Sequence, residues 1–295
     1  MTAHDVTVVI TVFNAAATLS IAIESAALLS PSSPILVLDD GSTDDSAAVA
    51  RDCSDRFGNV SVHELGRVGR AAALNAGFEL VSSEFAAILD ADDAAIAPRF
   101  GPDVAVLRAD PRLGMVGGSY IRLDLDRDEL RQHSYPSDDR SLRRALAYYG
   151  PFCHSTVTYR VAAVRDVGGF DPSLPSRIDQ DLWVRLAARG WRLANVDAEL
   201  AIHTKSGDSF FIANQSERER AATMLRRNAA AIRELDLPKW LYAVAVARAA
   251  YRFVPMALRS RVTPDLAPIS PADLAPDAAE LVARLQRALH ARSAK

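Results

Sequence analysis

Cysteine is scarce in this sequence: Cys53 and Cys153 are the only two among 295 residues. Two thiols are too few for a disulfide framework or a cysteine-based zinc site, which indicates a reducing compartment. No apolar run reaches the roughly 18 residues that a membrane-spanning helix needs. The N-terminus carries neither a charged leader nor a cleavable apolar segment. We therefore expect a cytoplasmic protein, or one that touches the inner face of the plasma membrane peripherally.

An excess of charge of one sign is also lacking. The formal net charge is −3, which argues against nucleic acid as the main partner. The chain is 49% hydrophobic and 24% charged, so it can bury a sizeable core and is not a disordered chain. Its length allows one large domain with an appendage, or two small domains.

Four β-rich segments alternate with helix-compatible stretches in the first hundred residues. They are Val6–Val12, Ile35–Leu38, Val60–Leu65 and Phe85–Leu89. Strands and helices that alternate at this spacing predict an α/β fold with a mostly parallel sheet. In such sheets, ligands bind beyond the carboxyl ends of the strands.

Acidic residues follow two of these segments. Asp39 and Asp40 come after the second, and Asp90, Asp92 and Asp93 come after the fourth. The D-x-D spacing would place Asp90 and Asp92 on the same side of an extended chain, which suits a hard divalent cation. The alternative is an acidic turn that caps the next helix. Because both clusters lie at predicted strand ends, a ligand site is favoured.

Six segments, in order and at close to the usual spacing, resemble family 2 glycosyltransferases with the GT-A fold. The segments are Val8–Asn14, Leu38–Asp44, Ala72–Gly77, Leu89–Asp93, Val167–Asp171 and Ile178–Trp183. The resemblance covers about residues 5–205. It implies a Rossmann-like GT-A domain with a mixed, mostly parallel sheet over residues 1–210, followed by a helical C-terminal extension over residues 211–295.

The resemblance implies a site for a nucleotide sugar and a divalent metal ion, Mn²⁺ or Mg²⁺. Asp92 would be the direct metal ligand, and Asp90 would face the ribose or a metal-bound water. Asp93 would cap a helix or support the metal ligands. His203 lies where relatives carry a metal or diphosphate contact, although an ordinary loop histidine is the alternative.

The same resemblance assigns the nucleotide pocket. Asp39 would accept a hydrogen bond from the N3–H of uracil or thymine, with Asp40 holding the turn. Thr11 and Phe13 would form the edge of the base pocket, where many relatives carry proline and tyrosine. Arg70 would lie near the nucleotide, unless it is a solvated arginine at a helix start.

On the acceptor side, Asp179 and Asp181 lie at the start of a predicted helix. A helix N-terminus keeps a carboxylate ionised and able to accept a proton. The resemblance implies that Asp179 is the general base, with simple N-capping as the alternative, and that Asp181 positions the loop. Ile178 replaces a glutamate that is usual in the family. His154 would line the acceptor cleft, or make a structural hydrogen bond.

The last ninety residues change in character. Ser216–Leu235 has helical periodicity, Trp240–Leu258 is a second helical run that carries Arg248 and Arg252 one turn apart, and Asp277–Arg292 is a final amphipathic helix. A basic, aromatic-bearing helix suits either an anionic membrane surface or packing on the catalytic domain or a second subunit. Peripheral membrane contact and a homodimer are both expected arrangements.

The sequence therefore predicts an inverting, metal-dependent glycosyltransferase that uses a UDP- or dTDP-sugar in cell-surface glycan or polysaccharide biosynthesis. Its acceptor would be a glycan, a lipid-linked sugar or a small molecule. A glycosidase would need an acid to protonate the leaving oxygen, whereas a metal-bound diphosphate leaves without one. The alternative is a non-catalytic nucleotide-sugar binding protein. A nucleotidyltransferase is disfavoured because Val12–Ala16 lacks a glycine-rich basic loop.

Overall fold

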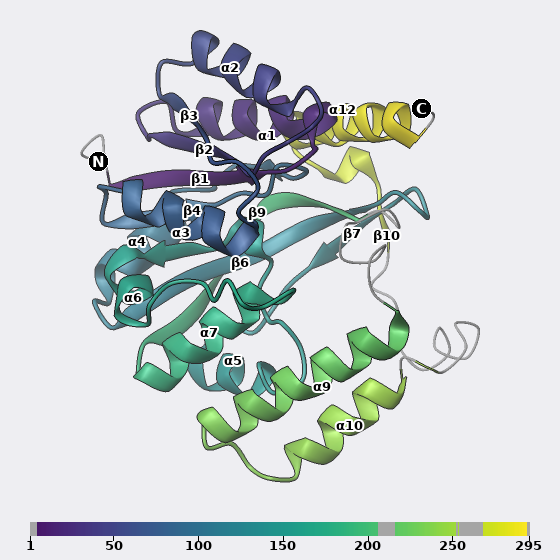
Figure 1. The fold of residues 1–295 in the computed structure, drawn as a ribbon. Coiled ribbons are helices and arrows are strands. Elements are labelled where there is room, and N and C mark those ends of the chain that lie inside the picture. Colours follow the sequence, from purple (N-terminus) through teal and green to yellow (C-terminus); the bar gives the residue numbers. More distant parts are fainter. Residues whose placement is uncertain (1–4, 206–215, 252, 254–267, 294–295) are drawn as a thin grey trace.

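The computed structural model describes residues 5–205, 216–251, 253 and 268–293. Strands and helices alternate through the first half, and helices dominate the end of the chain (Figure 1). The strands are β1 (Val6–Val12), β2 (Ile35–Asp39), β3 (Val60–Glu64), β4 (Phe85–Ile88), β5 (Ala94–Ala95), β6 (Leu113–Asp124), β7 (Glu129–His133), β8 (Thr158–Arg160), β9 (Arg192–Lys205) and β10 (Pro268–Ile269). The helices are α1 (Ala16–Leu29), α2 (Ser46–Arg56), α3 (Arg70–Leu80), α4 (Pro102–Ala109), α5 (Asp139–Ala145), α6 (Val161–Asp166), α7 (Ile178–Arg189), α9 (Glu217–Glu234), α10 (Leu241–Tyr251) and α12 (Pro276–Ser293), with short 3₁₀ turns η1 (His154–Thr156) and η2 (Pro271–Asp273).

These strands form one mixed sheet in the order β10-β7-β6-β8-β4-β1-β2-β3, with β9 beside β6 and β5 beside β9. The first half is parallel, since β1 pairs in parallel with β2 and β4, and β2 pairs in parallel with β3. The second half contains antiparallel neighbours, such as β4 with β8 and β6 with β7. The α/β fold with a mixed sheet expected from the sequence is therefore confirmed.

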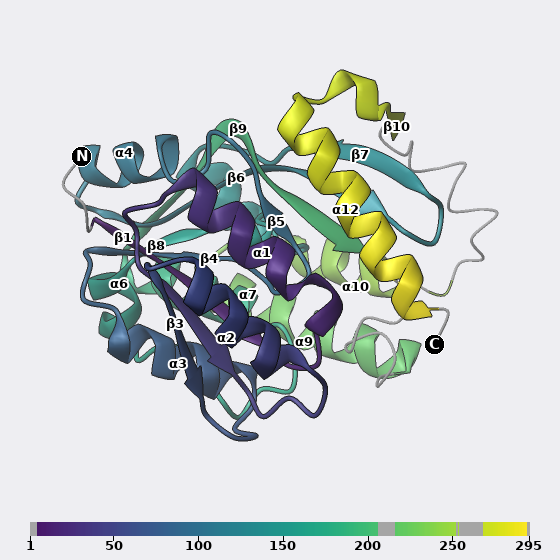
Figure 2. The same cartoon turned by 90° about the horizontal axis from the view of Figure 1, so that it is seen from above.

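Alternation along the central strand divides the core into two layers. Val8 and Ile10 pack with α1 and α2 on one face, whereas Val9 packs with α3 and α7 on the other. Successive side chains of a strand point to opposite faces, so a continuous apolar run is what a doubly covered strand requires. Figure 2 shows α1, α2 and α12 together over the upper face.

The C-terminal elements attach at two separate places. Helices α9 and α10 pack against each other below the sheet, with α9 also contacting α7. Helix α12 instead packs on α1, and β10 adds to the sheet edge beside β7. The division of the chain at residue 210 stays a prediction, and these contacts join both ends of the extension to the sheet domain.

The acidic turn after β4 does not cap a helix. After the fourth strand the chain turns, with the Asp93 N–H donating to the Asp90 carbonyl, and then enters β5 rather than a helix. The three carboxylates therefore converge through a turn and not along an extended chain. Just before α1, the side-chain oxygen of Asn14 accepts from the Thr43 N–H.

Among the described residues, none of the helices combines the length and apolarity needed to cross a membrane.

Candidate active site

A cavity of about 470 Å³ opens at the carboxyl edge of the sheet. Its lining comes from segments far apart in the sequence, including the turns after the strands, the start of α7 and one face of α9. Five residues expected at the site line it together: Arg70, Asp90, His154, Asp179 and His203. The others, Thr11, Phe13, Asp39, Asp92 and Asp181, lie outside its lining.

The acidic turn after β4 gathers three carboxylates. Oxygens of Asp90, Asp92 and Asp93 lie within 4.8 Å of one another. Asp92 is exposed, Asp90 is half-buried and Asp93 is fully buried. Although much of the residue is exposed, its carboxyl group is poorly solvated, and this desolvation followed by the charges of Asp93 and Asp90 raises the pKa of Asp92 to about 7. Such mutual repulsion among oxygen donors is relieved by a divalent cation, so this donor set fits Mg²⁺ or Mn²⁺.

Asp93 is an anchor within this turn. Its carboxylate accepts hydrogen bonds from the Thr204 N–H at 2.8 Å and from the Ser155 hydroxyl, and lies 3.0 Å from Nδ1 of His203. The register explains this contact, because β5 pairs antiparallel with β9 through Ala94 and Ile202. Asp93 and His203, the next residues along each strand, therefore become neighbours. Asp93 therefore holds the turn that carries Asp90 and Asp92, and it is not a helix cap.

His203 is the histidine closest to the acidic turn. Burial alone would lower its pKa, but the carboxylates of Asp93 and Asp92 raise the pKa to about 9. The ring is therefore charged at neutral pH when no other cation is near. With Nδ1 held by Asp93, Nε2 is the nitrogen left to contact a metal ion or a diphosphate oxygen.

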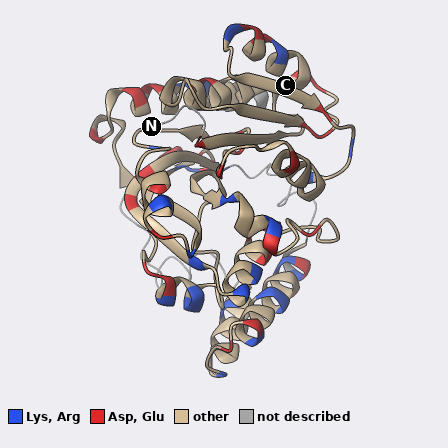
Figure 3. Ribbon diagram, turned by 90° about the vertical axis from the view of Figure 1, so that its left-hand side faces the viewer, with Lys and Arg blue, Asp and Glu red and all other residues tan. Residues whose placement is uncertain are grey.

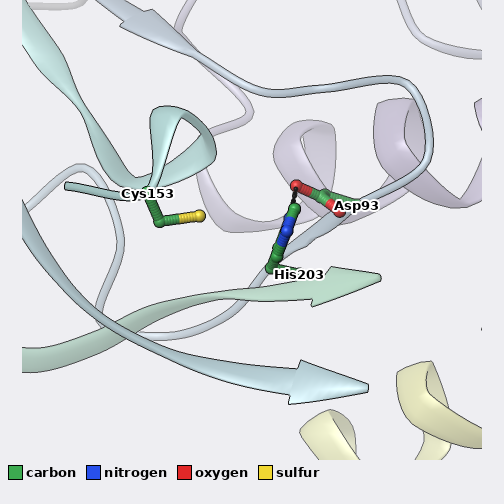
Figure 4. Close-up of side chains that lie close together, drawn as sticks. All are labelled: Asp93, Cys153 and His203. Carbon is green, nitrogen blue, oxygen red and sulfur yellow. Dashed lines mark hydrogen bonds and ion pairs between the residues drawn. The ribbon is translucent and has the colours of Figure 1, made fainter. Parts of the chain in front are cut away.

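The buried thiol of Cys153 lies beside this pair, as Figure 4 shows. Ligand atoms of Cys153, Asp93 and His203 lie within 4.8 Å of one another. Burial and the nearby Asp93 and Asp90 charges raise the pKa of the Cys153 thiol well above its usual range, so the sulfur is protonated. A neutral thiol is a poor ligand for Mg²⁺ or Mn²⁺, which leaves the carboxylates as the better donor set.

Arg70 connects the acidic turn to the opposite wall of the cavity. Its guanidinium pairs with Asp90 and donates to Nδ1 of His154 at 3.1 Å. Burial would raise the pKa of Asp90, but the Arg70 guanidinium beside it holds that pKa below its usual range. Arg70 at the start of α3 is therefore not a solvated surface arginine.

His154 presents a buried hydrogen-bond donor. Burial lowers its pKa, so the ring is neutral at pH 7. Since Nδ1 accepts from Arg70, the proton resides on Nε2. That nitrogen has no hydrogen-bond partner among the described residues. His154 lines the cavity, where a hydroxyl oxygen of a bound molecule would satisfy it.

The expected base pocket lies at the ends of β1 and β2. Thr11 and Asp39 belong to these paired strands, and Phe13 follows directly. The carboxylate of Asp39 is buried and accepts the Ser42 N–H at 3.3 Å. The guanidinium carbon of Arg67 lies 3.6 Å from the centroid of the Phe13 ring, a cation–π contact that the sequence did not indicate.

Asp40 has the structural role expected of it. Its carboxylate accepts the N–H groups of Val68 and Gly69 at 2.8 Å each and pairs with Arg67. These contacts hold the loop that leads into α3. They also place Arg67 over Phe13.

Asp179 lies in the first turn of α7, facing the cavity. Its carboxylate accepts the N–H of Gln180 at 2.8 Å. The preceding Arg177 has φ = 56°, a left-handed backbone that is costly outside glycine. The Arg177 guanidinium donates to the side-chain oxygen of Gln180 at 2.8 Å, which links this residue to the first turn of α7.

Asp181 points away from the cavity. It pairs with Arg185 one turn along α7 and with Arg227 of α9. The structure thus places it at the junction of two helices and not on the acceptor side. Sequence patterns around Asp181 carry no signal for its α9 partner, which lies 46 positions away.

Several cavity residues were missed at the sequence level. The aromatic wall contains Tyr120, Tyr135 and Phe152, with the two tyrosine hydroxyls 3.5 Å apart. Arg220 and Thr223 of α9 complete the lining. No local motif marks these residues, because their positions depend on how distant segments pack.

The family model that matches this chain and the two curated relatives compared with it below are all glycosyltransferases. The family model described as Glycosyl transferase family 2 matches residues 7–168. A pre-mycofactocin glycosyltransferase of Mycobacterium tuberculosis is 32% identical over 214 residues, which is 68% of this chain and 43% of the relative. The amylovoran biosynthesis glycosyltransferase AmsE of Erwinia amylovora is 26% identical over 162 residues, which is 55% of this chain and 60% of the relative. The chain thus spans less than two thirds of the length of either relative.

Solved structures share the fold. The mannosyltransferase PcManGT from Pyrobaculum calidifontis, in complex with GDP-Man and Mn²⁺, has a TM-score of 0.59 at 18% identity and covers 97% of this chain and 86% of its own. S. aureus TarS 1-349, in complex with UDP-GlcNAc, has a TM-score of 0.60 at 17% identity and covers 89% of this chain and 76% of its own. At such low identity the likeness concerns the fold.

Proposed function

The chain belongs to glycosyl transferase family 2, and from this premise we propose that it transfers a sugar from a nucleoside diphosphate sugar to an acceptor hydroxyl with inversion at the anomeric carbon. The observation that carries the proposal is the shared cavity, where Asp179 of α7 and the Asp90–Arg70 pair line the same space. A carboxylate on one wall, opposite the Asp90–Arg70 pair proposed to face the nucleotide, suits a one-step displacement of the diphosphate by the acceptor hydroxyl. Relatives named for amylovoran and succinoglycan biosynthesis support a role in making a cell-surface glycan or polysaccharide.

Asp92 and Asp90 would hold a divalent cation, Mn²⁺ or Mg²⁺, with Asp93 fixing the turn. His203 would be a further ligand or a direct contact to the diphosphate. Bound there, the cation supplies stabilisation of the negative charge on the departing diphosphate. A structural neighbour in complex with Mn²⁺ supports this assignment.

Asp179 would act as the general base. It would accept the acceptor hydroxyl proton while the hydroxyl oxygen bonds to the anomeric carbon and the bond to the diphosphate breaks. Its place in the first turn of α7, on the cavity lining, gives its carboxylate access to an acceptor bound there. The Nε2–H of neutral His154 would donate to a hydroxyl of the bound sugar or acceptor, and Tyr120 and Tyr135 would offer an aromatic wall for a sugar face.

The donor base would lie against Phe13, with its N–H directed to Asp39. We propose a uridine or thymidine diphosphate sugar, because the N3–H of either base suits a buried carboxylate acceptor. Arg67, stacked on Phe13, would either cover the base or move aside for it.

A panel of nucleotide sugars tests the proposal. UDP-, dTDP- and GDP-sugars are titrated by calorimetry with Mn²⁺ present and absent, and release of the nucleoside diphosphate is followed in parallel. We expect the wild type to bind a UDP- or dTDP-sugar tightly only with Mn²⁺, and Asp92→Ala to bind it weakly whether or not Mn²⁺ is present. An Asp92→Ala protein with an unchanged metal requirement would overturn the metal assignment, and preference for a GDP-sugar would overturn the base assignment.

A further inference from the structure

Three side chains beside the acidic turn bring a sulfur, a nitrogen and an oxygen atom to one place. Ligand atoms of Cys153, Asp93 and His203 lie within 4.8 Å of one another. Cys153 precedes η1, Asp93 lies in the turn after β4, and His203 lies near the end of β9, so three distant segments meet here. Figure 4 shows the Cys153 sulfur directed toward the other two side chains. The oxygen donors proposed for Mn²⁺ or Mg²⁺ leave this thiol unused.

The mixed donor set suits a softer cation. Proteins bind Zn²⁺ through cysteine sulfur, histidine nitrogen and carboxylate oxygen, whereas Mg²⁺ and Mn²⁺ prefer oxygen ligands. Three protein ligands leave the fourth tetrahedral position open for a water molecule. Cys153 and His203 both line the cavity, so a cation has a path to the site. The residue types therefore favour zinc over the cation of the acidic turn.

Hydrogen bonds hold the three ligands in place. The Cys153 carbonyl accepts the Thr156 N–H at 2.9 Å and the Thr156 hydroxyl at 2.8 Å. Oδ1 of Asp93 accepts the Thr204 N–H at 2.8 Å, and Oδ2 of Asp93 lies 3.0 Å from Nδ1 of His203. Cys153 and Asp93 are also buried. Ligands that are ordered before the metal arrives raise its affinity, because little conformational freedom is lost on binding.

The charge around the site also favours a cation. Asp90 and Asp92 lie in the same turn as Asp93, and oxygens of the three lie within 4.8 Å of one another. Many Lys and Arg residues lie instead on the helices at the foot of the molecule, as Figure 3 shows in blue. A Zn²⁺ ion on one thiolate, one carboxylate and one neutral imidazole forms a complex without net charge. Such neutrality suits the buried position of Cys153 and Asp93, because an uncompensated buried charge is costly.

We propose that Cys153, Asp93 and His203 form a second metal site, which binds Zn²⁺ in preference to Mn²⁺. On binding, bonds form from zinc to the sulfur, to a carboxylate oxygen and to a ring nitrogen. The thiol proton and one imidazolium proton are released to solvent, and no group is oxidised or reduced. The site goes beyond glycosyl transfer and does not depend on it.

Zinc at this site should interfere with the Mn²⁺ or Mg²⁺ site. Asp93 holds the turn that carries Asp90 and Asp92, and His203 is the proposed further ligand or diphosphate contact. A zinc ion bound to both Asp93 and His203 would break their mutual contact and shift the turn. We expect Zn²⁺ to inhibit transfer even when Mn²⁺ is saturating. This consequence alone rests on the proposed function.

Cobalt titration of the full chain tests the site. Co²⁺ is the spectroscopic probe for Zn²⁺, because a cysteine thiolate bound to it gives a charge-transfer band. Cys153→Ala is compared with the wild type and with Cys53→Ala, the matched control, since Cys53 is the other cysteine and is also buried. We expect a band that saturates at about one equivalent, and that Zn²⁺ removes, in the wild type and Cys53→Ala but not in Cys153→Ala. Zn²⁺ affinity, measured by competition with a chromophoric chelator, should fall by about tenfold to a hundredfold in Cys153→Ala.

Circular dichroism checks that each variant is folded, and nucleoside diphosphate release with an active donor and Mn²⁺ is measured with and without Zn²⁺. Relative to its own rate without Zn²⁺, the wild type should be inhibited about tenfold more strongly than Cys153→Ala. A folded wild type without the cobalt band, or a band that Cys153→Ala retains, would overturn the zinc site. Equal inhibition of the wild type and Cys153→Ala would overturn its effect on transfer. A wild type that shows the band but releases no nucleoside diphosphate would support the zinc site while contradicting the proposed function.

Discussion

The Asp93 side chain is fully buried, and its hydrogen bonds hold the acidic turn in which the exposed Asp92 lies. One carboxylate ties the turn after β4 to Ser155, Thr204 and His203. A buried carboxylate with this many partners is stabilised only while they stay in place. Asp93 therefore couples the position of the acidic turn to the orientation of the His203 ring.

Replacing Asp93 by asparagine should weaken metal binding. The amide keeps the shape but loses the charge that orients His203, so Mn²⁺ affinity should fall by about tenfold to a hundredfold. Electron paramagnetic resonance of free Mn²⁺ measures this directly. Asp126→Asn, at a half-exposed carboxylate beside Lys205, is the control and should bind as the wild type does. Equal affinity in all three proteins would contradict the positioning role.

Metal affinity should also depend on pH. The pKa of Asp92 is raised to about 7, so its carboxyl takes up a proton as the pH falls through 7. Protons and metal then compete for the same oxygens, and Mn²⁺ affinity should decrease from pH 8 to pH 6. Because Asp92 is exposed, solvent moderates the effect, and the fall should stay within about tenfold per pH unit. A flat titration over this interval would contradict the raised pKa.

At the scale of elements, α9 and α7 form one wall of the cavity. Asp181 of α7 accepts from both Arg185 and Arg227. The side-chain nitrogen Nε2 of buried Gln180 lies 3.5 Å from Oδ1 of Asn228 in α9. These contacts lie immediately beside Asp179. The orientation of the proposed base thus depends on a helix from the C-terminal part of the chain.

Arg227→Ala should loosen this junction. Both partners of the Arg227–Asp181 pair are largely buried, so the variant should lose about 1–3 kcal/mol of unfolding free energy. Urea denaturation measures the loss. Arg226→Ala is the matched control, because Arg226 is exposed on the same helix and forms no ion pair among the described residues, donating a hydrogen bond to Thr223 instead. Equal stability of the two variants would mean that the ion pair does not hold α9.

The local elements were predictable, but their long-range partners were not. The β-rich runs of Val6–Val12 and Phe85–Leu89 mark real strands because both faces of the sheet are covered, which demands continuous apolar residues. The partners of Asp93 could not be predicted, because they arise from pairing with β9, more than a hundred residues away. Tyr135 and Arg220 reach the cavity from a loop and a late helix that carry no motif. The family resemblance therefore predicted residues such as Asp90 and Asp179, whereas the aromatic and α9 residues of the cavity lining depend on tertiary packing.

At the scale of the whole molecule, the last helix, α12, shares a hydrophobic core with the first helix, α1. Ala278, Val282 and Leu285 of α12 pack in one cluster with Ile21 of α1 and Ile202 of β9. Arg284 adds an ion pair to Glu24 of α1. We propose that the chain from β1 to α12 unfolds as one unit.

Leu285→Ala tests this unity. Leu285 is fully buried, so its truncation should cost about 2–5 kcal/mol. The transition of the whole chain in urea, followed by near- and far-UV circular dichroism, should shift as a single step. Arg287→Ala, at an exposed position on the same helix, should leave the transition unchanged. A separate early step confined to helix content would show that α12 unfolds independently.

The central claim is that the transferred sugar of the donor lies in the same cavity as Asp179, the base that drives transfer. It is tested most directly by comparing Asp179→Asn with the wild type, measuring donor affinity by calorimetry and nucleoside diphosphate release with the donor and metal found active in the panel. The account predicts donor affinity within about twofold of the wild type and turnover reduced by about a hundredfold or more. Unchanged turnover in Asp179→Asn would remove Asp179 from the mechanism. A wild type that binds donor without releasing nucleoside diphosphate, with any acceptor tried, would favour a non-catalytic binding protein.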